Sequence, residues 1–209
     1  MQQILPGIYT WSWYSEEKGY NFNSYAIPTD DGLVVIDPVH ISEENLKELK
    51  ILGTPEHILL TNKDHERISA MFKQLFNSII YIHEHDANDL KEFPEGLFTE
   101  EAILPGGIQP ILIEHNKSPG ETAFYIPDKK LLIIGDALIG YPQGGFSLLP
   151  AIKYLDPEKT QSSLTKLLDY PYDTILVGDG YSVLHQPKEA LQRFLERKDI
   201  HLSFPVSKA

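Results

Sequence analysis

The stretch EHILLTNKDHER, residues 56–67, decides the expected fold. Residues 57–61 form a short run with apolar side chains at both odd and even positions, which is typical of a strand covered on both faces. A polar packet, residues 62–67, follows at the carboxyl end of that strand. Beyond it, apolar residues recur at helical spacing: Ile68, Met71, Phe72, Leu75 and Phe76. The packet is therefore expected in a strand-to-helix turn, at the edge of an α/β sheet where ligands bind.

Composition restricts the classes of function. The chain has 209 residues, which suits a single domain over residues 1–209. Its formal net charge is −12 and only three of its 18 basic residues are arginines, so nucleic acid is not an expected partner. It contains no cysteine, which excludes disulfides and Cys-based zinc sites. Without a basic leader or an apolar run near the roughly 20 residues of a membrane helix, we expect a cytoplasmic protein with no membrane partner.

The hydrophobic pattern and the turn residues predict two segments with a similar order of secondary-structure elements. Each is a meander of strands that continues into strand–helix units. The expected strands are 8–13, 22–27, 33–36, 57–61, 78–83, 108–114, 122–126, 131–134 and 174–177. The expected helices are 43–52 with Ser42 as N-cap, one after residue 66, a short one within 84–104, then 157–168 and 187–197. This weak internal symmetry predicts two sheets packed face to face with helices outside.

Four polar packets share the carboxyl end of an apolar strand: Asp64-His65, Ser118–Glu121, Gly135-Asp136 and Gly178–Gly180. Each alone is ordinary turn chemistry. Together with these packets, the chain contains the stretches LPGIYTW, NSYAI, GLVVIDP, SPGET, LLIIGDAL and ILVGDG. On this basis nearly the whole chain resembles the metallo-β-lactamase fold superfamily, which includes thioester-cleaving glyoxalase II-like enzymes. The resemblance implies an α+β fold, an αββα four-layer sandwich of two mixed sheets. It also implies a metal-dependent hydrolase of a small ester, thioester or phosphodiester.

The motifs depart from the superfamily pattern. The usual Thr-His-x-His-x-Asp-His is shortened, because Thr61 is separated from Asp64-His65 by only two residues. An ungapped register would instead place Asn62, Asp64, Glu66 and Arg67 at the ligand positions; the gapped register is preferred because it keeps Asp-His intact. Pro-Gly-His becomes Pro-Gly-Glu121, Gly-His-Gly becomes Gly-Asp179-Gly, and only Asp136 matches its bridging position.

Carried over in the gapped register, the resemblance implies five metal ligands: Asp64, His65, Glu121, Asp136 and Asp179. The expected catalytic groups are Asp64 and Glu121, the latter as an additional ligand or base, together with Arg67. One imidazole among carboxylates is an oxygen-rich set, which favours Mn, Fe(II) or Mg over a nitrogen-rich zinc site. The expected cofactor is one divalent ion, Mn, Fe or Zn. Asp37 resembles the aspartate that orients ligands from behind, with a plain turn carboxylate as the alternative.

Other hypotheses remain open. Clustered carboxylates without a metal would raise each other's pKa, so a cation is expected among them. Arg67 could fill the vacated metal position by pairing with Glu121 or Asp179, which would make the chain a non-hydrolytic protein that binds a small anion or a partner. Arg67 could also anchor an anionic small-molecule substrate, and an iron-dependent redox role is a third possibility. The 141–146 loop, with Tyr181 and Ser182, could form a wall of the site, or its aromatic residues could form an edge of the core. The oligomeric state is left open.

Overall fold

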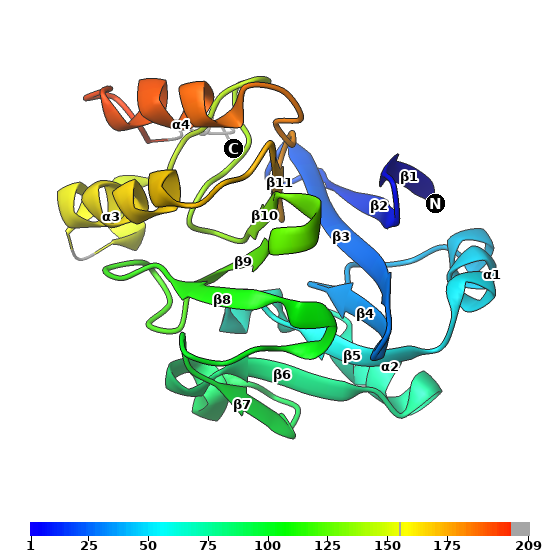
Figure 1. The fold of residues 1–209 in the computed structure, drawn as a ribbon. Helices are drawn as coiled ribbons and strands as arrows, with labels where there is room; N and C mark the ends of the chain where they lie inside the picture. Colours follow the sequence, from blue (N-terminus) through cyan, green and yellow to red (C-terminus); the bar gives the residue numbers. More distant parts are fainter. Residues whose placement is uncertain (155, 202–209) are drawn as a thin grey trace.

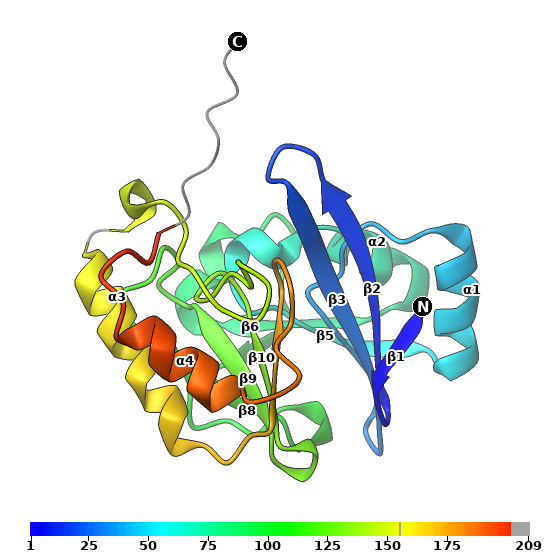
Figure 2. The ribbon, with the colours of Figure 1, turned by 90° about the horizontal axis from the view of Figure 1, so that it is seen from above.

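The computed structural model describes residues 1–154 and 156–201. Two sheets pack face to face, and helices cover both outer sides (Figure 1). Seen from above, the layers follow one another as α3 and α4, the four-stranded sheet, the seven-stranded sheet, and α1 with α2 (Figure 2). This is the α+β, αββα arrangement that the sequence predicts. No helix in the described ranges combines the length and the apolar character needed to cross a membrane.

The seven-stranded sheet follows the chain order. Its strands are β1 (Gln2–Leu5), β2 (Ile8–Ser15), β3 (Tyr20–Thr29), β4 (Gly32–Ile36), β5 (Pro55–Leu59), β6 (Ile79–His83) and β7 (Gly96–Phe98). Strands β1 to β4 pair antiparallel, as the predicted meander requires, and β4 to β7 pair parallel. The sheet is therefore mixed.

The second sheet has the order β11-β10-β9-β8. Its strands are β8 (Gln109–Leu112), β9 (Thr122–Ile126), β10 (Leu131–Ile134) and β11 (Thr174–Val177). Only β10 and β11 pair parallel. The α-helices are α1 (Glu43–Leu52), α2 (Ser69–Phe76), α3 (Pro157–Ser163) and α4 (Pro187–Leu195). The 3₁₀ helices are η1 (Lys63–Glu66), η2 (Glu84–Asp89), η3 (Pro105–Gly107), η4 (Pro127–Lys129), η5 (Ala151–Lys153) and η6 (Leu164–Asp169).

Most predicted elements are confirmed, and the differences have local causes. Ser42 caps α1 by accepting the N–H of Asn45 at 3.2 Å, as expected. The predicted 157–168 helix divides into α3 and η6. Strands β1 and β7 were not predicted, because both are very short and lie in segments of mixed polarity.

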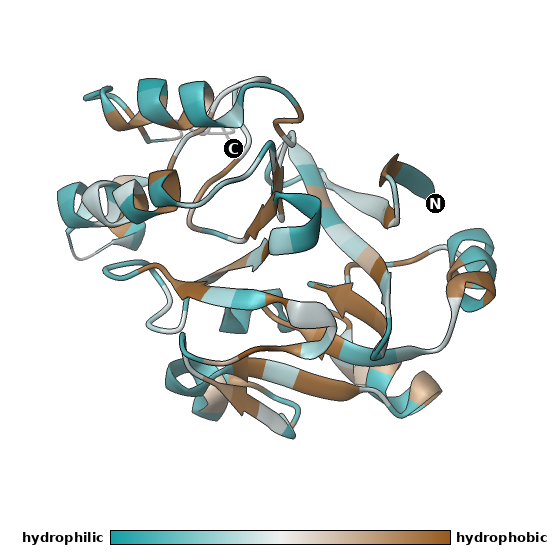
Figure 3. Ribbon diagram, viewed as in Figure 1, coloured by the Kyte–Doolittle hydropathy of each residue, from teal (hydrophilic) through white to brown (hydrophobic). Residues whose placement is uncertain are grey.

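Three hydrophobic layers hold the four structural layers together. Along β4, Val34 and Ile36 face the core between the two sheets, whereas Leu33 and Val35 face α1 and α2. Along β10, side chains alternate in the same way between the core that lies between the sheets and the core that contains η6 and α4. Strands buried on both faces, such as β4 and β10, therefore read as continuous apolar runs, and Figure 3 shows β4 as brown ribbon.

The parallel pairs β4–β5 and β10–β11 bring four strand ends to one edge of the molecule. Asn23 of β3 ties the two sheets together at that edge. Its backbone N–H donates to the Gly178 carbonyl at 2.7 Å, and its side-chain amide donates to the carbonyls of Val177 and Gly180, both at 2.9 Å. The polar residues that follow these strands are thus held at fixed positions around one site.

Candidate functional site

Asp37, the residue that follows β4, forms the back of the site. It is buried and accepts the Thr61 N–H at 2.9 Å, the Thr61 hydroxyl at 2.7 Å and the Nδ1–H of His65 at 2.8 Å. Because Thr61 donates its only hydroxyl proton to Asp37, the proton on Nδ1 belongs to His65. Asp37 therefore fixes the orientation of the imidazole, which is the orienting role that the sequence suggested.

The turn after β5 sorts its side chains between the site and the surface. Asn62 accepts the N–H groups of Asp64 at 2.9 Å and His65 at 3.2 Å, which starts η1. His65 then points into the protein, whereas the side chain of Asp64 is 52% exposed. Glu66 turns away and accepts backbone N–H groups of the 91–92 segment. Of the two registers, the gapped one therefore agrees with the inward position of His65.

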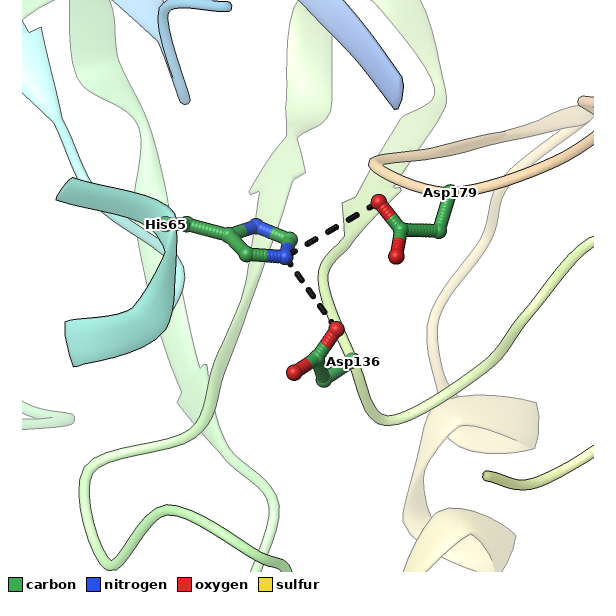
Figure 4. Close-up of side chains that lie close together, drawn as sticks. All are labelled: His65, Asp136 and Asp179. Atoms are coloured by element: carbon green, nitrogen blue, oxygen red, sulfur yellow. Dashed lines mark hydrogen bonds and ion pairs between the residues drawn. The ribbon is translucent and has the colours of Figure 1, made fainter. Parts of the chain in front are cut away.

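Three side chains that follow different strands converge at the centre (Figure 4). His65 Nε2 lies 3.1 Å from Asp136 Oδ1 and 4.0 Å from Asp179 Oδ1, and the three possible ligand atoms lie within 4.8 Å of one another. Asp136 follows β10 and Asp179 follows β11, and all three residues are buried. Of the five predicted ligands, these three form one cluster.

Arg67 enters this cluster. Its terminal nitrogen NH2 donates to Asp179 Oδ1 at 2.7 Å and lies 3.0 Å from His65 Nε2. The guanidinium also lies over the ring of Phe22, 4.8 Å from its centroid, and donates to the carbonyl of Asn23 at 3.4 Å. Its backbone has φ 41° and ψ −108°, a conformation that a residue with a Cβ rarely adopts. The guanidinium is therefore held in place from several sides.

Lys117 provides a second cation, which the sequence analysis did not identify. Its ammonium forms an ion pair with Asp136 Oδ2 and another with Asp64 Oδ2, the latter at 2.8 Å. Burial opposes its charge, but Asp136 and Asp64 outweigh burial and raise the pKa of Lys117. Asp64 therefore contacts Lys117 and lies apart from the central cluster; its role as a ligand or catalytic group stays a prediction.

The central groups hold each other charged. Burial and Arg67 lower the pKa of His65, but Asp37 and Asp136 outweigh them and raise it to about 10. The pKa of Asp136 is correspondingly low: burial raises it, but His65 and Lys117 have the larger combined effect. The carboxylate of Asp136 thus favours a proton on Nε2 of His65, whereas the terminal nitrogen of Arg67, 3.0 Å away, favours a lone pair there. The carboxylate of Asp179 holds the guanidinium in this position.

Glu121 lies buried beside the cluster in a different environment. Its Oε1 accepts the N–H of Ala137 at 3.0 Å, and its Oε2 has no hydrogen-bond partner among the described residues. Burial and the charge of Asp136 raise its pKa well above the ordinary value, which favours the neutral acid. Gly135 permits this packing, because a Cβ there would lie 2.2 Å from the Thr61 hydroxyl oxygen and 2.9 Å from Glu121 Oε1. The predicted roles of Glu121 as ligand and base remain untested.

A cavity of about 690 Å³ opens above the cluster. Four of its lining residues are lysine or arginine and three are carboxylates: Lys18, Arg67, Lys117 and Lys153 against Asp64, Asp136 and Asp179, with the imidazole of His65 among them. The remaining lining is mostly aromatic or apolar: Trp13, Tyr20, Phe22, Val39, His40, Ile68, Leu149 and Pro150. The 141–146 segment does not line this cavity, and its Phe146 packs in the core, which was the alternative for these aromatic residues; the lining segment on that side is 149–153, which includes η5.

The identities of His65, Asp136 and Asp179 suit a divalent ion, and Asp37 behind the imidazole is typical of metal sites. Their arrangement does not fit one. A metal ligand must offer a lone pair at Nε2, whereas the neighbouring carboxylates favour a proton there. The terminal nitrogen of Arg67 also bridges the same two atoms that a metal would bridge.

The family model of the metallo-beta-lactamase superfamily matches residues 2–197. The chain belongs to the metallo-beta-lactamase superfamily. Solved structures with this fold include the BLEG-1 B3 metallo-beta-lactamase, with a TM-score of 0.67, 21% identity and coverage of 84% of this chain and 93% of that one. A metallo-beta-lactamase from Pontibacter korlensis has a TM-score of 0.73 at 16% identity, covering 93% and 95%. The di-iron-bound form of TTHA1623 has a TM-score of 0.64 at 24% identity, covering 83% and 93%.

Two curated relatives of this superfamily member are described as hydrolases. A hydroxyacylglutathione hydrolase of Bartonella tribocorum is 28% identical over 125 residues, which span 57% of this chain and only 46% of that protein. The probable metallo-hydrolase YqgX of Bacillus subtilis is 27% identical over 183 residues, 76% of this chain and 84% of the relative. The family model and these relatives together assign the chain to a metallo-hydrolase family.

Proposed function

We propose that this member of the superfamily binds a small organic anion in the cavity above His65. The observation that carries the proposal is the group of cationic side chains, Arg67, Lys117 and Lys153, that lines this cavity in a protein whose net charge is −12. Cationic groups in a cleft with low-dielectric walls raise the local concentration of anionic ligands. Lys18 also lines the cavity and pairs with its exposed neighbour Glu17 at 2.6 Å.

The cavity also has the shape and chemistry of a small-molecule site. Its volume lies within the range of about 300–1,000 Å³ that is usual for ligand pockets. Trp13 and Phe22 form an aromatic wall on the β2–β3 side, with ring centroids 5.9 Å apart, and Leu149 lies among the apolar residues of the 149–153 segment. An anion that carries an apolar body would match both the charge and the walls.

Calorimetric titration with matched pairs of ligands tests this proposal. Small aromatic and aliphatic carboxylates and phosphate esters are compared with their neutral amides or alcohols, and we expect measurable affinity for the anions only. Lys153→Ala should weaken binding about two- to fivefold, as expected for one exposed charge, while Lys47→Ala on the outer face of α1 should leave it unchanged. Equal affinity for charged and neutral members of every pair would contradict the proposal.

A second candidate function is metal-dependent hydrolysis of a small ester, thioester or phosphodiester. The observation in its favour is the cluster of His65, Asp136 and Asp179 with Asp37 behind it. The name of the Bartonella tribocorum relative supports the same class of reaction. This function requires Arg67 to leave its present position and Nε2 of His65 to lose its proton.

Hydrolysis assays with added Mn, Fe(II) or Zn separate the two functions. The hydrolase function requires turnover that depends on the added metal and is lost in Asp136→Ala. We expect no such turnover, with anion binding unaffected by chelator.

A further inference from the structure

We infer that Arg67 and Lys117 take the place of divalent ions in this protein and exclude metal from the cluster of His65, Asp136 and Asp179. The inference goes beyond anion binding and does not depend on it. It concerns what balances the buried carboxylates, whereas the proposed function concerns what enters the cavity above them.

The position of Arg67 is the first argument. Its NH2 nitrogen lies 2.7 Å from Asp179 Oδ1 and 3.0 Å from His65 Nε2, and those two atoms are 4.0 Å apart. A metal bonded to both at about 2.1 Å would lie within about 3 Å of that nitrogen, at any position around the line that joins them. Metal and guanidinium would thus be two cations in contact, and only one of them can occupy the space.

Lys117 also places a cation where a metal would bind, on the other side of Asp136. His65 faces Oδ1 of this carboxylate, whereas the ammonium of Lys117 contacts Oδ2 and also bridges to Asp64. Both oxygens of the residue that matches the bridging position of the superfamily are therefore already in contact, Oδ1 with the imidazole of His65 and Oδ2 with the ammonium of Lys117. A second metal would meet Lys117 as the first would meet Arg67.

The placement of Arg67 is built into the fold. The positive φ of its backbone turns the side chain inward, the ring of Phe22 covers the guanidinium, and the carbonyl of Asn23 accepts from it. Asn23 is itself fixed by three hydrogen bonds to the segment that carries Asp179. The cation and its carboxylate therefore belong to one rigid unit, in contrast to a surface arginine free to swing away.

Titration of the wild-type protein with Zn and with Mn tests the inference first. Calorimetry should detect no stoichiometric binding of either metal, and the melting temperature should not rise when metal is added. Arg67→Gly should gain a site for about one ion, because glycine accepts the positive φ while the guanidinium is lost; bound metal should then raise its melting temperature in proportion to the logarithm of metal concentration. Adding Asp136→Asn to that variant should abolish the gain. Arg193→Ala, at an exposed position of α4, is the matched control and should behave as wild type.

Two results would overturn the inference. One is uptake of about one equivalent by the wild type that disappears in Asp136→Asn. The other is a folded Arg67→Gly protein that binds no metal. The wild-type titration requires no substitution, so it decides the question even if the variant does not fold. Metal uptake by the wild type would leave the separate test of anion binding intact.

Discussion

Asp86 and Asp136 are both buried carboxylates near the same edge of the molecule, yet their partners differ in kind. Asp86 is satisfied by neutral donors: the N–H of Lys63 at 3.0 Å, the N–H of Gly120 at 2.8 Å and the hydroxyl of Ser118. Asp136 is satisfied by side chains alone, the imidazole of His65 and the ammonium of Lys117. A carboxylate that only joins loops can use backbone groups, whereas one that faces a cavity is balanced by side-chain charges that a ligand can also meet.

The substitution Asp86→Ala should have the largest effect on stability. It leaves two backbone N–H groups and a hydroxyl without partners in a region that joins η1, η2 and the 118–120 loop. Unsatisfied buried donors cost about 1–3 kcal/mol each, so we expect a loss of about 4 kcal/mol. Urea unfolding measures it. A loss below that of Asp136→Asn would contradict the framework role of Asp86.

Asp136→Asn should destabilise by about 3 kcal/mol, because it leaves two cations without their buried anion. The pH dependence of stability gives a sharper readout. The pKa of His65 is raised from 6.5 to about 10, so its contribution to stability is fully present below pH 6.5 and is lost as pH rises toward 10. The variant removes one cause of that shift and should show a smaller fall over this range. An unchanged pH profile would show that Asp136 does not hold the charge of His65.

Arg67→Gly should cost about 1–2 kcal/mol, less than Asp136→Asn. The lost ion pair destabilises, while the strain of the positive-φ backbone, about 1–3 kcal/mol, is relieved. Millimolar guanidinium ion should recover part of the lost melting temperature by refilling the site. An equal recovery with Arg193→Ala would mean that the effect of the ion is not local.

Asp64→Asn should have the smallest effect, below about 1 kcal/mol, because this carboxylate is half exposed and Lys117 keeps its contact with Asp136. The melting temperature measures it. A loss as large as that of Asp136→Asn would place Asp64 in the central charge network, as the sequence predicts for a ligand.

The sequence predicts the layers well, because β4 and β10 alternate their apolar side chains between two cores and read as unbroken apolar runs. It also predicts that residues after strand ends meet, which His65, Asp136 and Asp179 confirm. Lys117 could not be identified, since nothing local distinguishes it from a solvated loop lysine. Its partners Asp64 and Asp136 are far from it in sequence and only the packing of the two sheets brings them together.

The most direct test of the central claim is a crystal of the wild-type protein soaked in Mn or Zn and measured at the absorption edge of the metal. We expect no anomalous peak among His65, Asp136 and Asp179, with the guanidinium of Arg67 still on Asp179. A peak within bonding distance of these three side chains, with Arg67 displaced, would contradict the claim that side-chain cations replace the metal in this protein.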